Sequence, residues 1–172
     1  KRKLISCNQS ILKHSKEYVK RCIKLCHELG GKELNLCLFA DDELATFDRN
    51  HILLPDIKKI RIIQNLLLPI LYELTKFADD YDIMLLLEPL NRYSTPYCTT
   101  ANDAVYIAKQ VNHTNFGILL DTFHMNIEED SFEDAILKSR KLLRHTHFAD
   151  NNRKMPGLGH INFNSILNIN FF

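Results

Sequence analysis

Ile83-Met-Leu-Leu-Leu-Glu-Pro89 is the stretch of sequence that decides the fold class of this chain. Its first five residues are apolar and run directly into Glu88. A continuous apolar run of this length predicts a short strand that is buried on both faces. Strands of this kind belong to parallel sheets covered by helices, so the stretch favours an α/β architecture.

Elements of the same kind recur on both sides of this strand. Further strands are predicted at Leu34–Ala40, Phe116–Leu120 and Thr146–Ala149. Helices are predicted at Ser10–Leu29, Pro55–Asp80, Ala101–Val111, Ser131–Leu143 and Phe163–Ile169, with a long loop at Asp41–Leu54. Pro69 is expected to kink or split the second helix, because proline removes a backbone donor. The alternation predicts one parallel sheet whose strands all end at the same edge.

The composition fits a single globular domain and excludes several other classes. The chain has 172 residues, is 45% hydrophobic and carries a formal net charge of +1. These values exclude disorder, and the low glycine and proline content excludes a collagen-like chain. The balanced charge gives no reason to expect nucleic acid or a membrane as a partner. No apolar run approaches the roughly 18 residues of a membrane span.

The cysteines and the first residues bear on location and completeness. Five cysteines without a CxxC pair are typical of free thiols in a reducing compartment, so a cytoplasmic location is expected. The chain opens with Lys1-Arg-Lys-Leu4, without Met and without a signal-peptide apolar stretch. We therefore expect a piece of a longer protein or a processed chain.

Three metal-ligand residue types stand where predicted strands end: Glu88, Asp121 and His147. They are separated by 33 and 26 residues, each about one strand-helix unit. In a parallel barrel the strand ends converge on one mouth, where active sites form. Two carboxylates and one imidazole favour Mn²⁺, Co²⁺ or Mg²⁺ over a structural zinc. The alternative is that each is an ordinary charged loop residue, although charges beside buried strands are costly unless paired or coordinating.

Further polar residues lie beside these three. His145 alternates with His147 on one strand, so both side chains face the same way, and His145 is expected to be a packed, hydrogen-bonded histidine. His124 begins the loop above the mouth and could donate to a substrate hydroxyl. Arg153 could hold a substrate oxygen, and the alternative is a solvated loop arginine.

Four motifs carry a resemblance to a known family. Glu88-Pro-Leu-Asn-Arg-Tyr93, Asp121-Thr-Phe-His-Met-Asn-Ile-Glu-Glu129, His145-Thr-His-Phe-Ala-Asp-Asn-Asn-Arg153 and Pro156-Gly-Leu-Gly-His-Ile161 resemble motifs of the D-tagatose/D-psicose (allulose) 3-epimerases. These enzymes are xylose isomerase-like TIM barrels. The resemblance spans about residues 10–168 and is strongest over 84–167.

The resemblance implies a fold, a metal site and a reaction. It implies Mn²⁺ or Co²⁺ held by Glu88, Asp121, His147 and a second glutamate, with His124 and Arg153 in contact with a small ketose. The implied reaction inverts C3 of the ketose through an enediolate. In it Glu88 is one of two catalytic glutamates, because inversion needs a base on each face of a planar intermediate. Dimers or tetramers are implied as well.

Two departures from the family pattern matter. Ser94 stands where the family has a substrate-contacting glutamate, which affects sugar preference or affinity. The fourth ligand is missing, because one more strand-helix unit past His147 would end after Phe172. The four predicted strands resemble family strands four to seven, against eight in a closed barrel. Residues 1–172 are therefore expected to form a single partial (β/α)8 TIM barrel domain that lacks the N-terminal strands and the last strand.

The expected function is a metal-dependent ketose 3-epimerase in the parent protein, inactive or nearly so as this piece. One alternative is another sugar isomerase of the same superfamily, such as an inosose-type enzyme. An endonuclease-IV-like DNA repair enzyme would need a basic groove and more histidine ligands. The last alternative is a truncated, non-catalytic barrel remnant that serves in interactions or has no function.

Overall fold

The computed structural model describes residues 2–41, 44 and 56–169 of the chain. Within these residues, four strands form one parallel sheet in the order β1-β2-β3-β4. The strands are β1 (Glu33–Cys37), β2 (Met84–Glu88), β3 (Phe116–Asp121) and β4 (Leu143–His147). The helices are α1 (Gln9–Glu28), α2 (Asp56–Ile62), α3 (Leu68–Asp79), α4 (Ala101–Val111), α5 (Thr122–Glu128), α6 (Phe132–Ser139) and α7 (Phe163–Leu167), and a π-helical segment η1 (Ile63–Leu67) joins α2 to α3.

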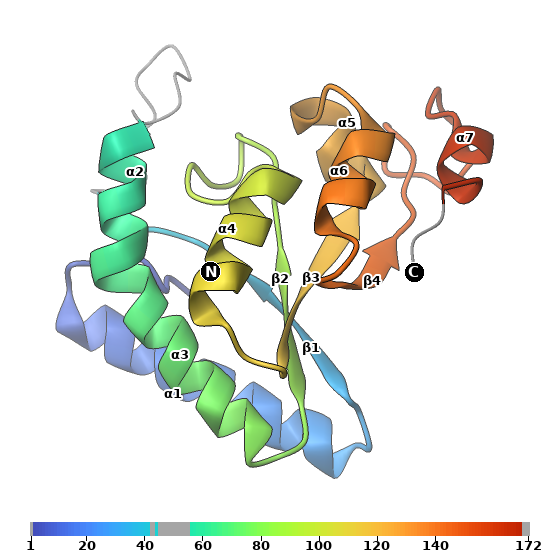
Figure 1. Cartoon of the computed structure of the whole chain (residues 1–172). Helices are drawn as coiled ribbons and strands as arrows, with labels where there is room; N and C mark the ends of the chain where they lie inside the picture. Colours follow the sequence, from blue (N-terminus) through green and yellow to red (C-terminus); the bar gives the residue numbers. More distant parts are fainter. Residues whose placement is uncertain (1, 42–43, 45–55, 170–172) are drawn as a thin grey trace.

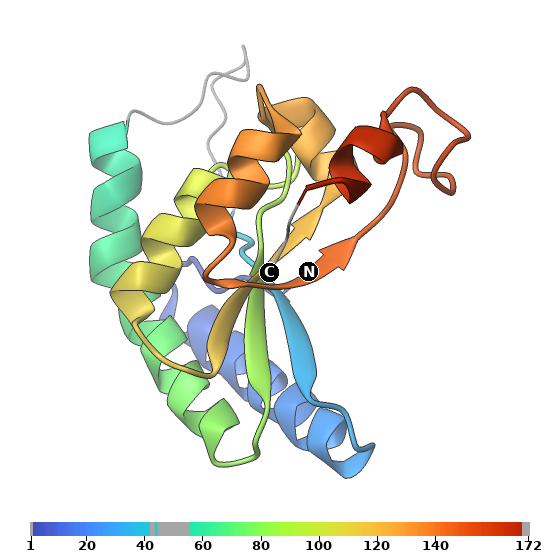
Figure 2. The ribbon, with the colours of Figure 1, turned by 45° about the vertical axis from the view of Figure 1, so that its right-hand side comes forward.

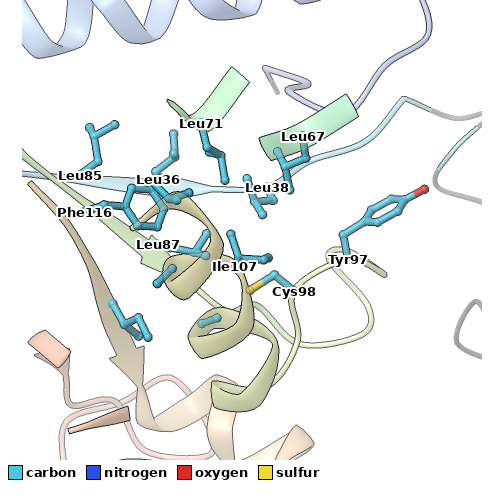
Figure 3. Close-up of a cluster of buried hydrophobic side chains, with 14 of the residues drawn as sticks. Leu36, Leu38, Leu67, Leu71, Leu85, Leu87, Tyr97, Cys98, Ile107 and Phe116 are labelled. Carbon is cyan, nitrogen blue, oxygen red and sulfur yellow. The ribbon is translucent and has the colours of Figure 1, made fainter. Parts of the chain in front are cut away.

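The two faces of the sheet have different chemistry. Helices α1, α3 and α4 pack along one face, which Figures 1 and 2 show from two directions. Buried apolar side chains from the strands line this outer face: Leu36, Leu85, Leu87, Phe116, Ile118 and Leu120. Figure 3 shows Leu36, Leu85, Leu87 and Phe116 of this set, together with Leu38 just past β1 and Leu71 of α3. Because strand side chains alternate, the residues between them face the opposite side, which we call the inner face. The inner face carries Asn35, Cys37, Glu88, Asp121, His145 and His147, and also the buried apolar residues Leu86 and Leu119.

Most of the predicted elements are present. The parallel α/β sheet alternating with helices is confirmed, and α4 has the predicted bounds. The strand predicted at Leu34–Ala40 is present as β1, which begins one residue earlier, at Glu33, and ends at Cys37. Most of the predicted loop Asp41–Leu54 lies outside the described residues, as does Pro55. Pro69 has a local effect: α2 and α3 are joined by η1, in which the Leu68 N–H bonds to the Ile63 carbonyl. This π-helical turn before Pro69 accommodates both the backbone N–H that proline lacks and the bulk of the proline ring.

The end of the predicted helix Ser131–Leu143 is wrong. Helix α6 ends at Ser139, and Leu143 is the first residue of β4. The bounds of the predicted strand Thr146–Ala149 are also wrong, because β4 covers Leu143–His147. Leu-Arg-His-Thr-His lacks an apolar run, and its strand conformation comes from pairing with β3, in which His147 lies beside Asp121. Helix α5, directly after β3, was not predicted at all.

Local chemistry explains where α1 begins and ends. The Asn8 side chain accepts the backbone N–H groups of Ser10 and Ile11 and so caps the first turn. At the other end Gly30 adopts a left-handed φ of +76°, and its N–H bonds back to His27. This turn directs the chain into β1.

Two chain-wide features complete the description. All five cysteines are free thiols. Among the described residues, no helix combines the length and the apolar character that a membrane crossing requires.

The core predicts a specific stability effect. Leu71 is fully buried among the outer-face leucines, whereas Leu29, just past α1, is 77% exposed. We expect Leu71→Ala to lower the free energy of unfolding by about 2–5 kcal/mol, because it leaves a cavity. Leu29→Ala, the matched control, should change it by no more than about 0.5 kcal/mol. Urea unfolding followed by circular dichroism measures both, and equal effects would show that this core is wrongly placed.

Candidate metal and substrate site

Three ligand-type side chains meet where neighbouring strands end. Glu88 is the last residue of β2, Asp121 the last of β3 and His147 the last of β4. One ligand atom from each lies within 4.8 Å of the other two. The parallel register brings them together, since Asp121 and His147 are direct partners in the β3–β4 ladder. The two carboxylates are buried, while the imidazole of His147 is 44% exposed.

Glu88 uses its two carboxylate oxygens differently. Oε2 accepts a hydrogen bond from Nδ2 of Asn35 at 2.6 Å and from the thiol of Cys37 at 3.3 Å. Oε1 lies 3.6 Å from Nδ1 of His147. The oxygen that faces the cluster is therefore distinct from the oxygen that anchors the side chain to β1.

Asp121 shows the same division. Its Oδ1 accepts the backbone N–H groups of Phe123 and His124, at 2.8 and 3.2 Å, and caps α5. Its Oδ2 lies 3.7 Å from Nδ1 of His147 and 3.6 Å from a guanidinium nitrogen of Arg153. Each carboxylate thus turns one oxygen toward the same imidazole nitrogen.

This donor set fits a divalent cation. Two buried carboxylates at short range repel one another and are costly unless a positive charge lies between them. Carboxylate oxygens with one imidazole nitrogen suit Mn²⁺, Co²⁺ or Mg²⁺. Three ligands converge from the described residues, which leaves room for further ligands from elsewhere or from substrate.

His124 and Arg153 lie side by side at the edge of the cluster. The Asn91 backbone N–H donates to Nδ1 of His124 over 2.9 Å, so the neutral ring carries its proton on Nε2. That nitrogen is 3.0 Å from Nη2 of Arg153, whose guanidinium stacks 3.8 Å above the Phe123 ring. Burial lowers the pKa of His124, Asp121 opposes the shift, and Arg153 adds to it. Both nitrogens are then donors and form no hydrogen bond with each other, so an acceptor oxygen beside them, such as that of a sugar hydroxyl, would satisfy both.

Ser94 and His145 lie outside the cluster. Ser94 is in the loop after β2, where its backbone N–H donates to the Asn91 carbonyl. His145 faces the same side as His147, with ring centroids 5.2 Å apart, and its Nδ1 is 3.2 Å from a Glu33 carboxylate oxygen. His145 has a polar partner, as predicted, but it is close to half exposed rather than packed.

Three supporting groups were not predicted from the sequence. Asn35 and Cys37 reach Glu88 from β1, and burial with the nearby Glu88 carboxylate raises the pKa of the Cys37 thiol to about 12. The third group is Asp150. The alternation of residues 35 and 37 along a predicted strand was the available signal for the first two; only the register of β1 against β2 could reveal their partner.

Asp150 organises the loop that carries Arg153. Its fully buried carboxylate accepts the backbone N–H groups of Asn151, Gly157, Gly159 and Ile161. Burial raises the pKa of this carboxyl, but the four donors outweigh burial and hold it below its ordinary value. A Cβ at Gly159 would clash with the Asp150 side chain, so the close approach requires glycine. Arg153 has a φ of +64°, a strained conformation that the closed loop maintains.

An ion pair joins the loop after β2 to helix α5. Glu128 of α5 accepts the backbone N–H of Arg92 at 2.6 Å and two guanidinium N–H groups at 3.0 and 3.1 Å. The Glu128 side chain is buried, and such a bidentate contact fixes geometry as well as adding energy. The loop after β2 is thereby tied to the helix that follows β3.

The fold and the strand-end site place this chain in a known class of proteins. The family described as xylose isomerase-like TIM barrel matches residues 2–169, and the chain belongs to this family. The barrel predicted from the four motifs is confirmed by this match and by the parallel sheet.

Within that family, the similarity to 3-epimerases expected from the motifs is confirmed. The chain is 46% identical over 90 residues to D-psicose 3-epimerase from Agrobacterium fabrum, an alignment covering 52% of this chain and 31% of that protein. A solved structure of D-psicose 3-epimerase in the presence of D-fructose superimposes with a TM-score of 0.80 at 29% identity, covering 96% of this chain and 54% of the other. Hydroxypyruvate isomerase from Escherichia coli is 26% identical over 168 residues, 96% of this chain and 60% of that protein. The chain thus spans about half the length of the epimerase whose structure it matches.

The Asp150 arrangement predicts a protease phenotype. Asp150→Ala removes the acceptor of four backbone N–H groups, so the exposed loop should lose its fixed conformation and let trypsin bind the peptide bonds after Arg153 and Lys154. We expect trypsin to cleave this variant there faster than the unaltered chain, with the far-UV circular dichroism retained. Asp130→Ala, which removes an exposed aspartate, is the matched control. Identical cleavage rates in all three proteins would contradict the proposed role of Asp150.

Proposed function

We propose that this chain carries part of the active site of a metal-dependent ketose 3-epimerase. The observation that carries the proposal is the convergence of Glu88 Oε1, Asp121 Oδ2 and His147 Nδ1 at the strand ends. The identity of 46% to a D-psicose 3-epimerase supports the choice of reaction within the family. The substrate we propose is a small ketose, and the assembled enzyme is a homo-oligomer.

The metal we propose is Mn²⁺ or Co²⁺, with Mg²⁺ also compatible, held by Glu88, Asp121 and His147. Such an ion, when bound, supplies Lewis-acid polarisation of the ketose carbonyl and of its neighbouring hydroxyl. Asp121 has one oxygen fixed by backbone donors, and it therefore presents the other oxygen in a single orientation. Such pre-organisation reduces the reorganisation needed when a ligand binds.

The proton transfer falls to Glu88. Its carboxylate stands at the inner face, with one oxygen anchored and the other directed into the cluster. We assign it the removal or return of the C3 proton next to the carbonyl, through an enediolate of the sugar. Inversion requires a second base on the opposite face of that planar intermediate, which the family resemblance identifies as a glutamate from the last barrel strand.

His124 and Arg153 orient the sugar. The Nε2–H of His124 and the guanidinium of Arg153 present donors to the same region at the edge of the cluster. A hydroxyl oxygen placed there would accept from both, and the closed loop around Asp150 keeps the arginine in position. Ser94 contributes a weaker hydrogen-bonding group where the family has a carboxylate.

By itself, residues 1–172 should be a poor epimerase. We propose that they form one partial TIM barrel domain, lacking the N-terminal strands and the last strand, with one of the two bases and three of the four ligands. Purified chain with Mn²⁺ should therefore convert D-fructose or D-tagatose at a negligible rate. Turnover at ordinary enzyme rates would overturn this part of the proposal.

A second candidate is isomerisation of a smaller hydroxycarbonyl substrate. The similarity to hydroxypyruvate isomerase extends over 96% of the chain, whereas the similarity to D-psicose 3-epimerase covers 52%. The higher identity favours the epimerase. Assays of the longer parent protein against D-fructose and hydroxypyruvate, side by side, distinguish the two.

Metal binding tests the proposed site directly. We expect one Mn²⁺ per chain, bound weakly because three ligands converge, and a rise in melting temperature on adding Mn²⁺. Glu88→Gln, Asp121→Asn and His147→Asn should each reduce Mn²⁺ affinity by at least about tenfold. Isothermal titration calorimetry measures the affinities. Metal-free Glu88→Gln should melt no lower than the metal-free parent, since it removes a like-charge repulsion.

Matched controls on α1 complete this experiment. Glu17→Gln and His14→Asn alter an exposed carboxylate and an exposed histidine far from the cluster, and they should bind Mn²⁺ as the parent does. A folded parent chain that takes up no Mn²⁺, or site variants that bind it as well as the controls, would indicate a non-catalytic barrel remnant instead.

A further inference from the structure

Strand β1 contributes no ligand to the cluster, yet two of its side chains hold Glu88. Nδ2 of Asn35 donates to Oε2 over 2.6 Å, and the Cys37 thiol lies 3.3 Å from the same oxygen. The amide must present its nitrogen here, because a carboxylate oxygen accepts and does not donate. Both side chains therefore converge on the oxygen that faces away from His147.

The sheet register explains this convergence. Cys37 pairs with Glu88 in the parallel β1–β2 ladder, and Asn35 pairs with Leu86 two residues earlier. Residues 35 and 37 share the inner face because strand side chains alternate. The long Glu88 side chain can thus be contacted by two residues of the neighbouring strand: Cys37 directly beside it and Asn35 two residues earlier.

The two carboxylates of the cluster are held in different ways. Asp121 is fixed by the backbone N–H groups of residues 123 and 124, which any non-proline sequence supplies. Glu88 is fixed by side chains, so its orientation depends on which residues occupy positions 35 and 37. Neither of these residues belongs to the apolar core, and Asn35 is exposed. Their contacts with Glu88 are therefore poorly explained as packing.

We propose that Asn35 and Cys37 are positioning residues that bind Oε2 of Glu88 and thereby direct Oε1 toward the metal and the substrate. The inference rests on the proposed function, since it assigns these residues to the same site. It extends the site by one strand beyond the three that carry ligands. Groups that orient a ligand typically change metal affinity or activity by about 10–100-fold when removed.

The test measures Mn²⁺ binding to Asn35→Ala, Cys37→Ala and Cys37→Ser by isothermal titration calorimetry. We expect about tenfold weaker binding for Asn35→Ala. Cys37→Ala should also weaken binding, and Cys37→Ser should restore part of the loss because the hydroxyl is again a donor. Asn115→Ala is the matched control, because Asn115 donates to the Asp79 carboxylate in an exposed pair. Cys7→Ala, which removes an exposed thiol, is the matched control for Cys37→Ala.

A second readout reports coordination itself. The visible absorption of Co²⁺ bound to the chain should shift in Asn35→Ala, because a freed Glu88 changes its ligation, and should stay unchanged in Asn115→Ala. Far-UV circular dichroism and melting temperature establish that each variant is folded. If Asn35→Ala fails to fold, the comparison of Cys37→Ala with Cys37→Ser decides the question. Tighter Mn²⁺ binding in Cys37→Ser than in Cys37→Ala supports the positioning role, and equal binding contradicts it.

The outcomes separate this inference from the function on which it rests. Folded variants with parental Mn²⁺ affinity and an unshifted Co²⁺ spectrum would overturn the positioning role while leaving the metal site intact. Equal affinities in Cys37→Ala and Cys37→Ser would overturn the donor role of the thiol. A folded parent chain that takes up neither ion would overturn the metal site and, with it, this inference.

Discussion

The candidate site depends on two carboxylates placed close together at the ends of adjacent buried strands. Glu88 and Asp121 present ligand atoms within 4.8 Å of one another in a poorly hydrated position. Such a pair opposes folding unless hydrogen-bond donors and a positive charge compensate for it. Asn35, Cys37 and two backbone N–H groups supply the donors, and the imidazole of His147 with the guanidinium of Arg153 lies on the remaining side.

The parts of the fold that could be predicted are those whose conformation follows from a local sequence pattern. Helix α4 and strand β3 have unambiguous patterns, an amphipathic face for the one and an unbroken apolar run for the other, and their bounds agree with the prediction within one residue. Strand β4 was misplaced because Arg144, His145 and His147 give no strand pattern. Its conformation is imposed by β3, and a sequence pattern carries no information about a neighbouring strand.

The candidate site also contains residues that local sequence predicts and contacts that only the folded structure reveals. Glu88, Asp121 and His147 could be named from the sequence because each closes a predicted strand, and parallel strands end together. Their grouping in space agrees with that expectation, while their roles remain a proposal. The contacts of Asn35 with Glu88, and of Asp150 with four residues up to eleven positions away, follow from register and loop closure. No local spacing encodes either contact.

The alternation between an apolar outer face and an inner face that carries the candidate site residues has a consequence for substitution. Successive residues along one strand, such as Leu36 and Cys37 or Leu87 and Glu88, lie in different surroundings. One of each pair packs against the helices, and the other faces the cluster at the strand ends. A substitution at the inner position can therefore alter the chemistry of the site while the packing of the interior stays as it is.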